Sequence, residues 1–248
     1  MSTTEKLLGV IKNGDARDQV EAVFELAKEG DYQYIDLLVQ ALEDEDWEVR
    51  RDAAYYLGRI GWRSAVEKLG ELIANDPMDD NKNVAIYAAQ STGFPSAAPL
   101  IIKGLEDENP EIRIDCRTAL YRLFGDSIVL LLDPEEEELM EDSEDRRRAY
   151  LNNAEEIRAW WQATKDAYDH DKTYFMGQEA TPALIFEEFK KAPNTNDAYL
   201  ELLEDWTGQE VGEYSRKMLK LWDSWLSRHG SKFQKGKKYF YGKELPLE

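Results

Sequence analysis

The sequence has little of what disulfide-linked, zinc-binding and membrane-spanning proteins need. Its 248 residues include one cysteine, Cys116, and two histidines, His170 and His229. A single cysteine cannot close an internal disulfide, and no Cys/His pairs show the spacing of a zinc site. No stretch approaches the roughly 20 apolar residues of a membrane span, and no basic segment followed by an apolar one opens the chain. We therefore expect a cytoplasmic protein without membrane contact.

Glycine, proline and basic residues are also scarce. With 15 Gly, 8 Pro and 42% hydrophobic residues, the composition favours a helical protein over a disordered chain or a β-sandwich. The 31 basic residues are outnumbered by 51 acidic ones, which gives a formal net charge of −20. Such a charge repels phosphate backbones and attracts cationic proteins. We expect a basic protein partner and no nucleic acid.

An internal repeat sets the expected architecture. LEDEDWEVR (42–50) and LEDENPEIR (105–113) lie 63 residues apart, and intermediate matches such as Leu26 with Leu57 lie 31 apart. This half-period is the length of one helical hairpin, and hairpins that repeat in this way stack into a solenoid. We predict an all-α, right-handed α-α solenoid with four repeats in residues 1–130.

The segment DEDWEVRRDAAYYLGRIG (44–61) resembles the HEAT-like repeats of phycobilisome-lyase type, which suggests a bacterial protein. The shared pattern is an acidic turn, Val-Arg, two small residues and Leu-Gly, and the resemblance covers about half the chain. In that family the arginine and a following acidic residue tie neighbouring repeats together. The matching residues in this sequence are Arg50, Asp52, Arg113 and Asp115, whereas the third copy has Ala85 where the arginine is expected.

A second duplication, 65 residues apart, lies in residues 149–248. It aligns Ile157, Trp160, Tyr168, Lys172, Tyr174, Phe175 and Gly177 with Trp222, Trp225, Phe233, Lys237, Tyr239, Phe240 and Gly242. Each copy predicts a Trp-bearing helix followed by a short extended aromatic strip. Trp and Tyr bury much area while keeping a polar end, so these Trp/Tyr-rich units are expected to cap the solenoid. Residues 131–148, which contain DPEEEELMEDSED, are expected to be an inserted acidic loop.

No catalytic constellation emerges from the sequence. No nucleophile–base arrangement, metal cluster or Gly-rich phosphate loop is present, and close carboxylates are expected by chance in so acidic a chain. His170 and His229 fall in corresponding loops, and Cys116 occupies the small packing position equivalent to Ala53. We therefore predict no enzyme activity, no cofactor and no metal.

The candidate partner-binding residues are the acidic turns before the first helix of each repeat, two tryptophans and the acidic insertion. Repeats stack at roughly 10 Å intervals, so such turns would form one anionic ridge. Helix capping and partial packing between repeats are the competing explanations. The candidates are Glu43, Asp44, Glu45, Asp46, Trp47, Trp62, Glu106, Asp107, Glu108, Glu135, Glu136, Glu137 and Glu138.

The tail from Lys232 to Lys243 alternates lysines with aromatic residues, as strips that bind single-stranded nucleic acid do. The favoured interpretation is that its aromatics dock on Trp222 and Trp225 while its lysines meet acidic neighbours, because the whole chain is so negative.

These features favour an immunity protein that neutralises a basic bacterial toxin as a monomer in a one-to-one complex. Two alternatives stay open. The repeat resemblance implies a bilin lyase-like protein, and the solenoid alone is compatible with a scaffold in a larger assembly.

Overall fold

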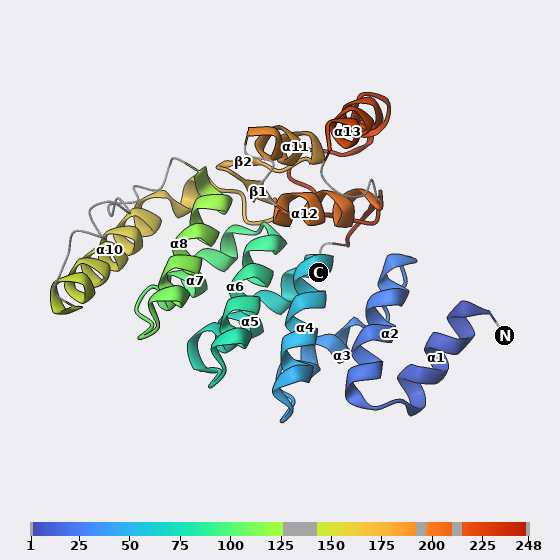
Figure 1. Ribbon diagram of the computed structural model, residues 1–248, viewed down its shortest axis with the longest axis horizontal. Helices are drawn as coiled ribbons and strands as arrows, with labels where there is room; N and C mark the ends of the chain where they lie inside the picture. The colour runs from blue at the N-terminus through green and yellow to red at the C-terminus, as the bar shows by residue number, and fades with distance from the viewer. Residues whose placement is uncertain (1, 126–142, 192–196, 210–214, 247–248) are drawn as a thin grey trace.

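The computed structural model describes residues 2–125, 143–191, 197–209 and 215–246 (Figure 1). They form an all-α solenoid of helical hairpins, as the periodicity predicts, with two short hairpins of strands. The helices are α1 Thr3–Asn13, α2 Ala16–Lys28, α3 Ile35–Ala41, α4 Trp47–Ile60, α5 Val66–Asn75, α6 Asp79–Thr92, α7 Ala98–Gly104, α8 Pro110–Phe124, α10 Ser143–Thr164, α11 Pro182–Lys191, α12 Asp197–Thr207 and α13 Arg216–His229. None of the helices described combines the length and apolarity needed to cross a bilayer.

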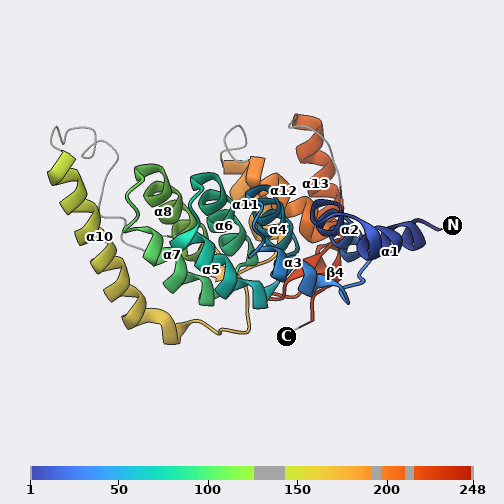
Figure 2. The same ribbon diagram turned by 90° about the horizontal axis from the view of Figure 1, so that it is seen from below.

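The solenoid has two layers of helices. Figure 2 shows α2, α4, α6 and α8 in one layer and the shorter α3, α5 and α7 in the other. Helix α10 packs against α7 at the end of the stack, so that Ile157 and Trp161 join the same continuous core as Leu57 and Leu69. This core explains the stability of the stack, because each hairpin buries its apolar faces only against its neighbours.

Local sequence signals start and end the helices of the first layer. The side chains of Asp15, Asp46 and Asn109 accept hydrogen bonds from the first-turn amides of α2, α4 and α8. At their other ends these helices run into glycines with positive φ: Gly30, Gly61, Gly93 and Gly125. The N-cap of α6, Met78, makes no such bond. Each helix of this layer therefore begins at a turn that contains acidic residues and ends beside a glycine.

The structure corrects the register expected for the third repeat. Gly61 and Gly93 end equivalent helices 32 residues apart, and this spacing places Lys82 and not Ala85 opposite Arg50. Lys82 also forms an ion pair equivalent to that of Arg50. The Lys82 Nζ lies 2.7 Å from Asp107 of the next turn, just as the Arg50 Nε lies 2.7 Å from Asp76. The third copy keeps the inter-repeat ion pair with a different cation.

The two C-terminal copies contain the same short hairpin of strands. Strands β1 (Tyr174–Phe175) and β2 (Gln178–Glu179) form one antiparallel hairpin, and β3 (Tyr239–Phe240) and β4 (Lys243–Glu244) form the other. In each copy the hydroxyl of the first tyrosine accepts a hydrogen bond from the amide five residues earlier. Both turns also place a non-glycine residue at positive φ, Met176 in one and Tyr241 in the other.

The two strips terminate helices. The amides of Met176 and Gly177 donate to the carbonyls of Arg122 and Leu123 at the end of α8. The amides of Tyr241 and Gly242 donate in the same way to the end of α12. As a result the C-terminal units cover the glycine-marked ends of the first helix layer, and α11–α13 lie along that edge of the solenoid (Figure 1). They cap one edge of the stack as well as its last repeat.

The inserted loop is shorter than expected at its C-terminal boundary. Helix α10 begins at Ser143, so residues 143–148 are helical and do not belong to a loop. The rest of the expected loop, including Glu135 to Glu138, lies outside the described residues.

The substitution Gly61→Ala tests the docking of the C-terminal tail on the end of α4. A Cβ on Gly61 would lie 2.0 Å from Cε of Lys238, and the φ of Gly61 is 77°. Gly61→Ala should therefore lower the free energy of unfolding by about 2 kcal/mol or more, from left-handed backbone strain and the displaced lysine. Gly230→Ala is the matched control, because Gly230 has a φ of −60° and no heavy atom within 4 Å of the added Cβ. Equal losses in urea denaturation would contradict this docking.

Candidate protein-binding site

The acidic turns lie on the edge of the solenoid that the C-terminal units leave open. Each turn precedes a helix of the first layer, so the turns lie at the N-terminal ends of α2, α4, α6 and α8, opposite α11–α13 (Figure 1). The predicted candidates at Glu43–Asp46 and Glu106–Glu108 are thus on one side. We call the exposed carboxylates of these turns the acidic edge.

Some of these carboxylates stabilise the turns in which they lie. The Asp44 carboxylate accepts from the Asp46 amide, and the Asp46 carboxylate caps α4. The Arg50 Nη1 donates to the carbonyls of Asp44 and Glu45, which closes the turn. Arg113 makes the same two bonds to the carbonyls of Asp107 and Glu108. Asp44, Asp46 and Asp107 are therefore structural residues as well as charges.

Other carboxylates of the turns are free to meet a partner. Glu45 and Glu108 are exposed, and within the described residues no ion pair engages either carboxylate. Glu43 pairs with Lys68, and Glu106 pairs with Arg158. These are exposed ion pairs, which contribute about 0–1 kcal/mol and can be exchanged at little loss.

The turn between α5 and α6 also contributes to the acidic edge, although the sequence analysis omitted it. Asp79 and Asp80 are exposed there, and Asp79 lies within 2.9 Å of the Asn109 side chain of the next turn. The signal that could have identified them is the half-period, which places this turn midway between the two quoted acidic strings.

The two candidate tryptophans differ in their environments. Trp47 is partly exposed, and the Arg51 guanidinium lies 5.2 Å above its ring. Trp62 is only 5% exposed and packs against the Tyr32 ring at 5.5 Å, so it is a core residue and is not available as a surface contact. The chain turns inward after Gly61 and buries this side chain.

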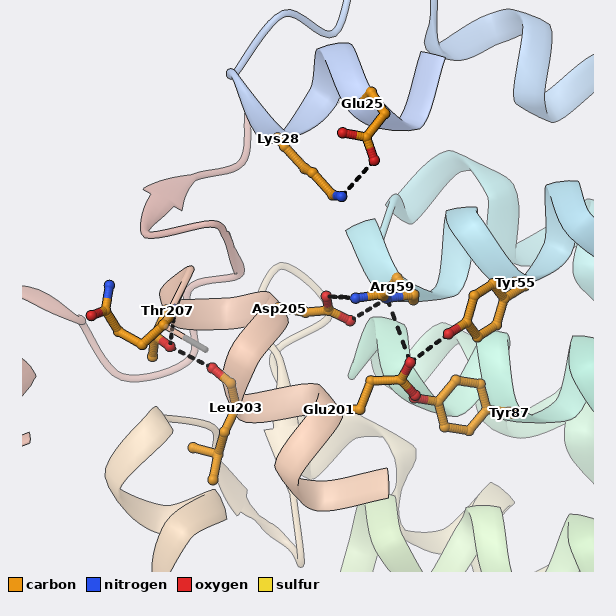
Figure 3. Close-up of polar contacts among 10 residues, drawn as sticks. Glu25, Lys28, Tyr55, Arg59, Tyr87, Glu201, Leu203, Asp205 and Thr207 are labelled. Atoms are coloured by element: carbon orange, nitrogen blue, oxygen red, sulfur yellow. Dashed lines mark hydrogen bonds and ion pairs between the residues drawn. The ribbon is translucent and has the colours of Figure 1, made fainter. Parts of the chain in front are cut away.

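The opposite edge is closed by a buried cluster of polar side chains (Figure 3). Arg59 of α4 binds both oxygens of Asp205 of α12, with Nη2–Oδ1 at 2.6 Å and Nε–Oδ2 at 2.9 Å. The Asp205 side chain is 1% exposed. Next to this pair, Glu201 accepts hydrogen bonds from the hydroxyls of Tyr55 and Tyr87. The cluster fixes α12 to both α4 and α6.

Lys238 is buried beside this cluster. Its Nζ donates to the carbonyl of Ser91 and lies 4.8 Å above the ring of Trp206. Burial lowers the pKa of Lys238 to about 7, although the nearby Asp205 opposes this effect. Burial also raises the pKa of Asp205 to about 6.

The basic aromatic tail is therefore built into the fold. Lys243 donates to the Lys28 carbonyl, and Lys237 pairs with Glu244. Phe233 lies 6.1 Å from Trp225, close to the expected docking, whereas Phe240 is fully buried against Phe24 of the solenoid.

The residues considered for chemistry are separated from one another. Cys116 is fully buried, and burial raises the pKa of its thiol. His170 and His229 are exposed beside Trp161 and Trp225. In the described ranges, no three His, Cys, Asp or Glu side chains lie close enough together to hold a metal ion.

Comparison with known proteins supports the fold. Residues 4–90 match the family model for HEAT repeats. The match is to HEAT repeats in general, so the phycobilisome-lyase type and the bacterial origin stay predictions. HEAT repeats also support the coarser functional prediction, a solenoid that interacts with proteins.

One relative changes the interpretation of activity. The chain is 26% identical over 123 residues to a protein named deoxyhypusine hydroxylase from Cryptococcus neoformans var. neoformans serotype D (strain B-3501A). The match covers 48% of this chain and 34% of that relative, so it spans about a third of the relative's length. The prediction of no enzyme activity is contradicted, because this distant relative bears an enzyme's name.

The Arg59–Asp205 pair can be tested by removing its cation. Arg59→Met leaves a buried carboxylate unpaired and should lower the free energy of unfolding by about 3–5 kcal/mol. Arg63→Met is the control, because the partner of Arg63 is Asp171, whose side chain is 69% exposed, and the loss there should stay below about 1 kcal/mol. Similar losses in chemical denaturation would show that the buried pair does not fix α12.

Lys238 predicts a pH dependence of stability. Its pKa is about 7 in the folded protein and 10.5 as the unperturbed value, so between these limits the unfolded chain binds the additional proton. Stability should therefore rise with pH, by about 2 kcal/mol from pH 7 to 9. Lys238→Met should remove this slope in urea titrations, whereas Lys235→Met, at an exposed lysine of the same tail, should keep it. An unchanged slope in Lys238→Met would refute the assignment.

Proposed function

We propose that this chain is a protein-binding solenoid that takes up a basic protein along its acidic edge. The observation that supports the proposal most directly is the asymmetry of the two edges. One edge is covered by α11–α13, and the other presents Glu45 and Glu108 in equivalent, exposed turns. A net charge of −20 adds long-range attraction for a cationic partner.

The spacing of the turns defines the kind of surface that would fit. Glu45 and Glu108 lie two repeats apart, about 20 Å at the usual helix spacing, with Asp79 and Asp80 between them. A partner with basic side chains along one face could meet all three turns. The backbones of the two outer turns are fixed by Arg50 and Arg113, so little order has to be gained on binding.

Charge reversal tests the edge. The double variant Glu45→Lys/Glu108→Lys should slow association with the captured basic partner about tenfold at low salt and weaken its salt dependence. The control Glu29→Lys/Asp166→Lys makes the same charge change at exposed acids near the covered edge. Stopped-flow or biosensor kinetics measure both, and equal slowing by the control would mean that only net charge matters.

A narrower form of the proposal is an immunity protein that neutralises a basic toxin in a one-to-one complex. Its support is limited to the charge distribution and the exposed acidic edge. Coexpression with the products of adjacent genes tests it, with the mass of the complex measured by light scattering. A stable one-to-one complex with a toxic product is expected, and a large multi-protein assembly would favour a scaffold instead.

A second candidate function is enzymatic, and the observation that favours it is the similarity to a protein named deoxyhypusine hydroxylase. If this chain shares that activity, deoxyhypusine incubated with it under air, with dioxygen as the oxidant, should gain one oxygen atom. Mass spectrometry of the product, with and without added transition metals and a reductant, would decide between a shared activity and a shared repeat fold.

A further inference from the structure

A hollow of about 210 Å³ lies between α6 and α8. Ile86 and Ala119 form apolar parts of its wall, and polar side chains from both helices complete it. It lies between the acidic edge and the C-terminal units, because its residues occupy the middle and the last turns of the two helices. A cavity of about 150 Å³ can hold a benzene molecule, so this one is large enough for the end of a long side chain.

The hollow contains a polar atom that the fold does not satisfy. The Asn83 Oδ1 is buried without a hydrogen-bond donor. The side chain of Gln90, which is 5% exposed, also lines the hollow. An unsatisfied buried polar group costs about 1–3 kcal/mol, so the Asn83 Oδ1 indicates a ligand that supplies a donor.

Asp115 adds a negative charge to the same wall. Its carboxylate is partly buried, and it forms no ion pair or hydrogen bond with the residues described. Burial raises its pKa, Glu111 raises it further, and Arg122 lowers it. An ammonium or guanidinium group would relieve the cost of burying this carboxylate and would donate to the amide oxygens.

Arg122 also lines the hollow and lowers the pKa of Asp115, but no ion pair joins the two side chains among the described residues. Its guanidinium lies 5.3 Å above the ring of Tyr199 of α12 instead. Glu201 lies next to the hollow as well, bound to the Tyr87 hydroxyl. Glu201 lies 3.7 Å from the Arg59 guanidinium, so Asp115 is the carboxylate of the hollow that a bound cation would meet.

We propose that the hollow between α6 and α8 binds an alkylammonium or guanidinium group, the chemistry at the end of a lysine or arginine side chain. This inference rests on the proposed function in one respect: it gives a basic partner a specific anchoring pocket beside the acidic edge. A free small amine offers the same chemistry, and the experiment separates the two sources.

The experiment titrates ¹⁵N-labelled full-length protein with n-butylammonium, n-butylguanidinium and, as the neutral control, n-pentanol. We expect saturable shifts of the α6 and α8 amides with the two cations only. Asp115→Asn should weaken cation binding at least tenfold and Asn83→Leu severalfold, whereas Asp36→Asn, the same change at an exposed residue of α3, should leave it unchanged. Equal binding of pentanol, or unchanged affinity in Asp115→Asn, would overturn the proposal.

A lysine-containing peptide and the free amine distinguish the sources. Tighter binding of the peptide supports a protein side chain as the natural occupant, and equal binding supports a free amine. The acidic edge is assessed separately, because Glu45→Lys/Glu108→Lys leaves the hollow intact. If these reversals abolish partner binding while wild-type protein binds no amine, the pocket proposal fails and the proposed function stands. If amines bind but the charge reversals have no effect on partner binding, the proposed function fails and the pocket proposal stands.

Discussion

The buried pair between Arg59 and Asp205 is the interaction on which the arrangement of this protein depends. It joins the second repeat of the solenoid to α12, which follows it by more than a hundred residues. The bonds of Tyr55 and Tyr87 to Glu201, the two strips and Lys238 hold the C-terminal units to the same edge. With these contacts, one edge of the solenoid is covered and the acidic edge becomes the open one.

Basic and acidic side chains have different roles in this arrangement. Arg50 and Lys82 form ion pairs between successive turns. Arg59 and Lys238 bind the C-terminal units to the solenoid. Within the part of the chain that the structure describes, exposed carboxylates such as those of Glu45 and Glu108 have no ion pair, and they contribute to the strongly negative field. Because these basic side chains make contacts within the fold, the exposed carboxylates determine the charge that a partner meets.

The repeats and the C-terminal duplication could be predicted from the sequence because both depend on local periodicity. The buried state of Trp62 could not, because it depends on where the chain turns after Gly61. The register of the third repeat is not evident from the sequence, because Lys82 replaces an arginine there and the equivalence follows from the glycines that end the helices. The docking of Phe240 on Phe24 joins residues far apart in sequence, so no pattern indicates it. The hollow between α6 and α8 likewise depends on two helices that the sequence does not show side by side.

The central claim is that one edge is closed by buried polar contacts and the other is open to a partner. Carboxyl footprinting of the native protein, read residue by residue by mass spectrometry, tests it most directly. The account predicts rapid labelling of Glu45 and Glu108, no labelling of Asp205, and protection of Glu45 and Glu108 but not of Glu29 or Asp166 when a basic partner is bound. Labelling of Asp205 as fast as that of Glu45, or protection confined to Glu29 and Asp166, would contradict it.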